Sequence, residues 1–130
     1  MKQLLLVIVL TTIHLTGYSQ KKFKQVECLN KVCVLYKWAK NPDGKSELQI
    51  KFKNKSKLHQ VVNLELGLYE SGILVEQSDI SACLGKNIFS NALQDIHILS
   101  SEYIETLDYN KNAIEIKTLS FEMEKTENCE

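Results

Sequence analysis

The chain has 130 residues, of which 44% are hydrophobic and 25% are charged, as in an ordinary folded domain. Its 16 basic residues are all lysines, and they balance 16 acidic residues. A chain with no net charge and no arginine, the residue that reads bases through paired hydrogen bonds, is not expected to bind nucleic acid.

Residues 1–19 have the pattern of a secretory signal peptide. Lys2 supplies the positive start, and residues 4–10 form an apolar run that is shorter than the roughly 20 residues needed to cross a bilayer. We expect cleavage between Ser19 and Gln20, and no cysteine sits at the cleavage point to carry a lipid. The mature chain is therefore expected in the periplasm or at the cell surface, without a membrane span. Its length of about 110 residues is enough for one domain, residues 20–130.

All four cysteines, Cys28, Cys33, Cys83 and Cys129, lie in the expected mature chain. An even number in an oxidising compartment predicts two disulfides, and the spacing lacks the paired C-x2-C knuckles of a zinc site, so no metal is expected. Pairing Cys28 with Cys33 and Cys83 with Cys129 is simplest in sequence. Pairing Cys28 with Cys129 and Cys33 with Cys83 would close much longer loops, and the sequence does not decide between the two.

Most of the chain alternates between apolar and polar residues, the pattern of antiparallel strands with one buried face. Residues 23–31 lack a clear period and are expected to form an irregular lead-in. The expected strands follow at 34–39, 48–53, 62–69 and 73–81. Turn-forming segments separate them at 41–44, 54–57 and 70–72. This spacing predicts an antiparallel meander, as in small β-sandwiches.

The segment 88–107 combines two patterns. Several apolar residues recur at helical spacing, whereas Ile96, His97 and Ile98 alternate as in a strand. We expect a short helical turn at 90–94, followed by a strand at 95–99.

The last strand is expected to begin at Ile114 and to reach Met123. Its apolar phase slips at Thr118, which predicts a β-bulge there. The tail after residue 123 is expected to be solvated, except where Cys129 ties it to the domain.

The stretch 48–56, followed by 62–69 and 70–75, resembles the hairpin common in immunoglobulin-like and fibronectin-like bacterial extracellular sandwiches. In those domains a strand ends in Asn-x-Ser or Asn-x-Gly, and a glycine turn joins the next two strands. The resemblance implies a small all-β, antiparallel immunoglobulin-like β-sandwich with a surface or binding role, and it carries no catalytic residue.

Candidate catalytic groups are few. A nucleophile needs a base and an orienting group, and the sequence offers only the isolated histidines His59 and His97 beside scattered serines. No G-x-S-x-G turn is present. We therefore expect neither a catalytic centre nor a cofactor.

Four lysines at alternate positions form a candidate contact face: Lys51, Lys53, Lys55 and Lys57. They belong to a basic segment, residues 21–57, that precedes an acidic one, residues 58–130. Lysines on a strand discourage edge-to-edge pairing. Their functional interpretation is a surface for an acidic partner or an anionic glycan.

The sequence thus favours a non-catalytic binding module whose partner is another protein, and it gives no indication of the oligomeric state. One alternative is an inhibitor or immunity-type protein for an exported enzyme, which would need a rigid, disulfide-held loop. The other is a carbohydrate-binding domain or a small hydrolase, which would need a concave aromatic groove.

Overall fold

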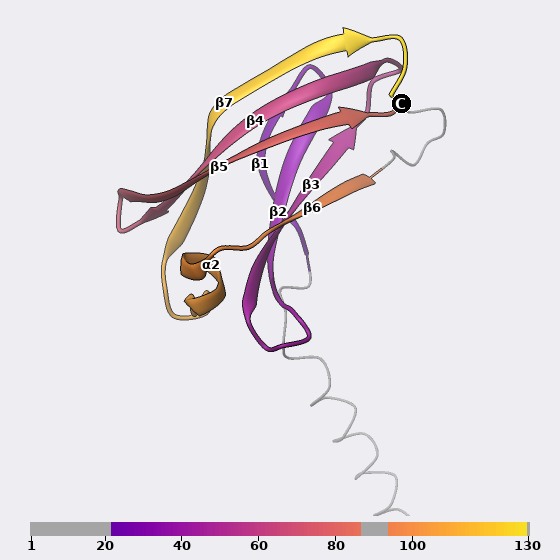
Figure 1. Ribbon diagram of the computed structural model, residues 1–130. Coiled ribbons are helices and arrows are strands. Elements are labelled where there is room, and N and C mark those ends of the chain that lie inside the picture. The colour runs from indigo at the N-terminus through magenta and orange to yellow at the C-terminus, as the bar shows by residue number, and fades with distance from the viewer. Residues whose placement is uncertain (1–21, 87–93, 130) are drawn as a thin grey trace, which may run out of the picture.

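The structure, a computed structural model, describes residues 22–86 and 94–129. The elements, in chain order, are β1 (Lys24–Leu29), β2 (Val32–Lys40), β3 (Ser46–Asn54), β4 (His59–Glu70), β5 (Ile73–Leu84), β6 (Gln94–Leu99), α2 (Glu102–Thr106) and β7 (Ile114–Thr126). They form a four-stranded sheet in the order β1-β2-β3-β6 and a three-stranded sheet in the order β5-β4-β7, both antiparallel (Figure 1). The predicted all-β antiparallel sandwich is confirmed.

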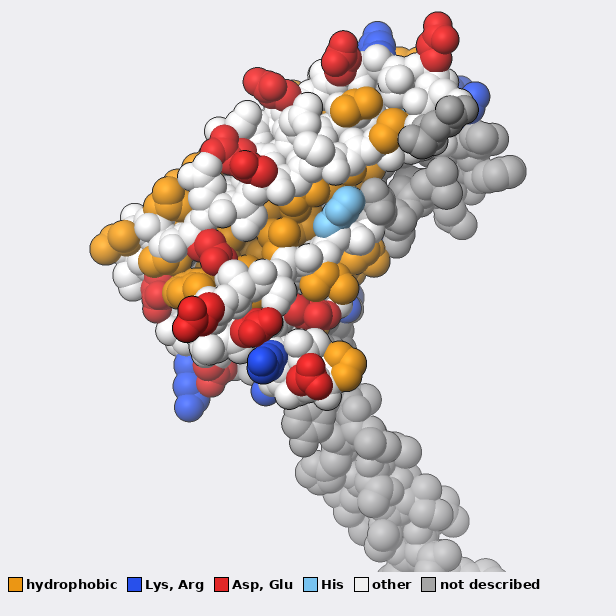
Figure 2. Space-filling view, in the orientation of Figure 1, with side chains coloured by type: hydrophobic (Ala, Val, Ile, Leu, Met, Phe, Trp, Pro, Cys, Tyr) orange, Lys and Arg blue, Asp and Glu red, His pale blue; other side chains and the backbone are white. Residues whose placement is uncertain are grey.

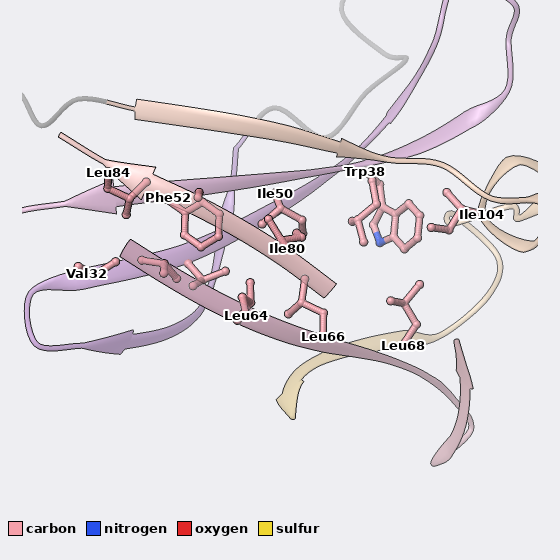
Figure 3. Close-up of a cluster of buried hydrophobic side chains, with 14 of the residues drawn as sticks. Val32, Trp38, Ile50, Phe52, Leu64, Leu66, Leu68, Ile80, Leu84 and Ile104 are labelled. Carbon is pink, nitrogen blue, oxygen red and sulfur yellow. The ribbon is translucent and has the colours of Figure 1, made fainter. Parts of the chain in front are cut away.

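The core lies between the two sheets. Side chains at every second position of β3 and β4 face one another there, each 0–2% exposed: Leu48, Ile50, Phe52, Leu64, Leu66 and Leu68 (Figure 3). This is the inward set expected of strands with a period of two. Trp38 extends the core toward α2 and stacks on Tyr109, with ring centroids 5.8 Å apart.

The prediction that residues 23–31 form an irregular lead-in is wrong, because residues 24–29 form the strand β1. This strand pairs with β2, but its register shifts between Gln25 and Glu27, which leaves Val26 as an extra residue. A bulge interrupts the alternation of side chains, so the strand lacked its usual sequence pattern. Glu27 of β1 also contacts the other sheet, where its carboxylate accepts a hydrogen bond from Thr118.

The segment 94–107 contains both a strand and a helix. The strand expected at 95–99 is present as β6, which pairs with β3. The expected helical turn at 90–94 lies outside the described residues except for Gln94, which belongs to β6. The helix α2 occurs later, and it is capped by the Ser101 side chain, which accepts a hydrogen bond from the Ile104 N–H at 3.1 Å.

The bulge predicted in the last strand is confirmed. In β7, Ser120 lies opposite Glu65 and Thr118 lies opposite Leu66, so Leu119 is the extra residue. Leu119 turns to the outer face of the sheet and is 39% exposed.

Two disulfides join Cys28 to Cys33 and Cys83 to Cys129. The first links facing residues of β1 and β2, and the second ties the end of β5 to the tail after β7. Of the two connectivities left open by the sequence, the structure has the one with the shorter loops. Two disulfides suit an oxidising, exported environment. The leader expected at 1–19 lies outside the described residues, and no helix in the described part is long and apolar enough to cross a membrane.

Tryptic mapping of alkylated, unreduced protein should recover this pairing. Cleavage after Lys31 separates Cys28 from Cys33, so the disulfide is expected to hold peptide 25–31 to peptide 32–37. The second is expected to hold peptide 58–86 to peptide 126–130. A peptide 25–31 joined to 126–130, or alkylated cysteines without reductant, would contradict the connectivity.

Candidate functional site

A cavity of about 740 Å³ opens at one end of the sandwich. Three parts of the chain meet there: the β1–β2 turn, the β3–β4 connection and the end of β7 (Figure 1). The volume is within the range of about 300–1,000 Å³ that is usual for small-molecule sites.

Four of the nine described residues that line this cavity, which we call the lysine pocket, are lysines. Its charged residues are Lys31, Lys55, Lys57 and Lys125. Its uncharged polar residues are Asn30, Ser56 and Gln60, and its apolar residues are Leu58 and Met123. Among the residues that the structure describes, no carboxylate and no aromatic ring lines it.

The β1–β2 turn holds Lys31 at the rim. Asn30 and Lys31 have φ of 48° and 67°, the left-handed pair of a two-residue type I′ hairpin. The disulfide between Cys28 and Cys33 braces the hairpin one residue inside each strand end, since β1 ends at Leu29 and β2 begins at Val32. The Lys31 carbonyl accepts a hydrogen bond from the Lys55 N–H at 2.8 Å, which fixes the turn against the next loop.

Asn54 shapes the loop that carries Lys55 and Lys57. Its side chain, 1% exposed, donates to the carbonyls of Leu58 at 2.9 Å and Gly85 at 3.1 Å. Its Oδ1 accepts from the N–H of Ser56 at 3.0 Å and from the Ser56 hydroxyl at 2.7 Å. Since the loop ends are tied to one buried side chain, its lysines project from a fixed backbone.

Lys125 reaches the pocket from the other sheet. It lies opposite Gln60, as Met123 lies opposite Val62, so both belong to the inner face of β7. Glu124 alternates with them and is exposed on the outer face. Glu124, the acidic residue directly before Lys125 in sequence, therefore points away from the pocket.

The predicted lysine ladder divides at the end of β3. Lys51 and Lys53 lie on the outer face of the four-stranded sheet, because Phe52 between them is buried. Lys51 Nζ lies 4.4 Å from the centroid of the Phe23 ring. Partial burial, followed by repulsion from Lys53 and Lys37, lowers the pKa of Lys51 below its usual value.

Lys55 and Lys57 instead join Lys31 and Lys125, which the sequence analysis did not select. Lys31 was missed because β1 was not predicted. Lys125 has a signal in the sequence: after the bulge it shares the phase of Phe121 and Met123, the apolar side of the last strand.

Charge is unevenly arranged over the molecule. Figure 2 shows acidic side chains spread along the side that carries β5, β6 and α2, with hydrophobic side chains between the two sheets. The pocket gathers four lysines, and none of them forms an ion pair with another described residue.

The two histidines lie on different sheets. His59 Nδ1 accepts a hydrogen bond from the Lys86 N–H at 3.1 Å, and His97 packs edge-on against Phe52 at 5.6 Å between ring centroids. Within the described residues, no group of three or more His, Cys, Asp or Glu side chains could hold a metal ion.

Comparison with protein-family models, with curated proteins and with solved structures finds no match. The likeness to immunoglobulin-like domains therefore stays a prediction, and the role of the lysine pocket is inferred from the geometry of this chain.

Proposed function

We propose that the mature chain is an exported, non-catalytic binding module that holds an acidic partner in the lysine pocket. One observation carries the proposal: four lysines from three separate segments converge on one cavity that no described carboxylate lines. Gathering like charges costs free energy through their mutual repulsion. An anionic ligand offsets that cost, and the fixed loops lower the entropy lost on binding.

The arrangement of the histidines also favours binding over catalysis. A catalytic base needs a nucleophile and an orienting group within hydrogen-bond reach. His59 is engaged by a backbone N–H, and His97 packs on the core at another strand. The proposal assigns neither of them a chemical role.

An inhibitor of an exported enzyme is the second candidate, and the disulfide-braced β1–β2 turn favours it. That turn would enter an enzyme cleft with Asn30 and Lys31 at its tip. The two candidates differ in what they require: an inhibitory tip depends on the turn alone, whereas a pocket ligand also depends on Lys57 and Lys125.

Affinity capture from an envelope fraction, with residues 20–130 as bait, tests the proposal. Reversing Lys55 and Lys57 to Glu is expected to weaken capture about tenfold or more, because two attractive contacts become repulsive. The same reversal of Lys51 and Lys53 is the matched control, because it changes the charge equally on β3, the strand that leads into this loop. It is expected to leave capture unchanged within a few-fold.

The opposite result would be loss of capture when Lys51 and Lys53 are reversed, with capture retained when Lys55 and Lys57 are reversed. It would place the contact on the outer face of the sheet. His59→Gln and His97→Gln are expected to leave capture intact and the partner chemically unaltered. Turnover of the partner that disappears in a folded histidine variant would overturn the non-catalytic assignment.

A further inference from the structure

We propose that the group held in the lysine pocket is a polyvalent oxyanion, that is, two or more phosphate or sulfate esters clustered on one ligand. This inference rests on the proposed function, and it adds the chemistry that the pocket selects.

The charge of the pocket sets the valence of the ligand. Lys31, Lys55, Lys57 and Lys125 surround one cavity, and among the described residues no acidic side chain lines it or pairs with them. A single carboxylate would neutralise one lysine and leave three without a counter-charge in the pocket. Two clustered phosphate or sulfate groups supply about two to four negative charges and match the set.

The type of cation also suits tetrahedral oxyanions. Arginine presents a planar fork that matches two oxygens of a carboxylate or of a phosphate, whereas a lysine ammonium is a compact charge with three donors on a flexible stem. Several such ammonium groups can approach one ester from different sides without a fixed plane. Asn30 at the rim and Gln60 at the base add neutral hydrogen-bonding groups.

Two apolar residues indicate where the body of the ligand lies. Leu58 is 46% exposed and lines the pocket together with Met123. Neutral sugar rings are usually held by stacking on aromatic side chains, and no described aromatic ring lines this cavity. Recognition is therefore assigned to the esters, with an aliphatic contact beside them. A phosphorylated lipid headgroup and a sulfated or phosphorylated glycan share this chemistry.

Calorimetric titration of the disulfide-bonded mature chain tests the valence and the chemistry. Inorganic tripolyphosphate is the main probe, orthophosphate controls for valence, and citrate controls for charge carried by carboxylates. Tripolyphosphate is expected to bind about tenfold or more tightly than orthophosphate, and to weaken as salt is raised. Equal affinities for tripolyphosphate and orthophosphate, or for tripolyphosphate and citrate, would overturn the inference.

Single substitutions locate the site. Lys57→Ala and Lys125→Ala are each expected to weaken tripolyphosphate binding by about two- to fivefold, as the loss of one exposed ion pair does. Lys53→Ala, on the outer face, is the matched control and is expected to have no effect. Since Lys57 and Lys125 are exposed and Lys53 is half-exposed, folding is expected to be retained, and circular dichroism checks it. Binding that responds to Lys53 and not to Lys57 or Lys125 would place the oxyanion outside the pocket.

Two further probes distinguish the sources. One is a heparin-derived sulfated oligosaccharide, and the other is a phosphatidylcholine vesicle containing cardiolipin, whose headgroup carries two phosphates. Pocket-dependent binding of either supports the inference and assigns the source. If envelope capture depends on Lys55 and Lys57 but tripolyphosphate does not bind, the proposed function stands and the oxyanion assignment falls. If tripolyphosphate binds in the pocket but no envelope partner is captured, the oxyanion assignment stands. The proposal that the pocket holds an acidic partner from the envelope would then fall.

Discussion

Leu66→Ala is expected to lower the free energy of unfolding by about 2–5 kcal/mol, as in other buried leucine truncations. Leu66 has no exposed surface and lies at the middle of β4, the central strand of its sheet, facing the other sheet (Figure 3). Because β5 and β7 hold β4 on both sides, the backbone cannot close around the lost volume.

Urea denaturation of the oxidised protein measures this loss. Leu74→Ala in the same sheet is the control, since Leu74 is 44% exposed, and it is expected to cost less than about 1 kcal/mol. A loss below about 1 kcal/mol for Leu66→Ala would contradict its inward orientation and the register of β4.

The sequence predicted the strands whose two faces meet different surroundings. In β3 the buried Leu48, Ile50 and Phe52 alternate with half-exposed polar residues, so the period of two is visible without any tertiary information. The slip at Thr118 was visible for the same reason, because a bulge exchanges the faces of a strand. β1 gave no such signal, since its bulge at Val26 falls in the middle of a six-residue edge strand.

The order of strands could not be predicted from local pattern. β6 joins the sheet of β1, β2 and β3, although β4 and β5 precede it in the chain and form the other sheet. Alternation specifies which side of a strand is buried, but not which neighbour supplies the other half of the core. The disulfide pairing was open for the same reason.

This limit explains the partial success at the candidate site. Lys55 and Lys57 were selected from their spacing, but their companions were taken to be the next lysines along the chain. The strand β3 ends at Asn54, and the loop that follows it lines the lysine pocket. Lys31 lies near the start of the described chain and Lys125 near its end, so only the strand topology brings them to the same cavity.

Asn54→Ala is expected to lower the free energy of unfolding by about 2–6 kcal/mol, because four hydrogen bonds, each worth about 0.5–1.5 kcal/mol net, are lost. It is also expected to weaken tripolyphosphate binding, although Asn54 is uncharged and does not line the pocket. The reason is that its side chain fixes the loop that carries Lys55 and Lys57.

Denaturation and calorimetric titration of the same variants separate the two effects. Asn63→Ala is the matched control, because Asn63 is exposed and accepts one hydrogen bond from Ser81 on the outer face. Ser56→Ala removes only the hydroxyl contacts of the loop, so it is expected to cost about 1 kcal/mol and to keep the protein folded if Asn54→Ala does not. Full-strength tripolyphosphate binding by a folded Asn54→Ala protein would show that this network does not position the lysines. If only Ser56→Ala folds, full-strength binding by that variant would show the same. Weakened binding by a folded Asn54→Ala protein, which keeps all four lysines and every residue that lines the pocket, would show that the pocket depends on the backbone geometry that Asn54 imposes.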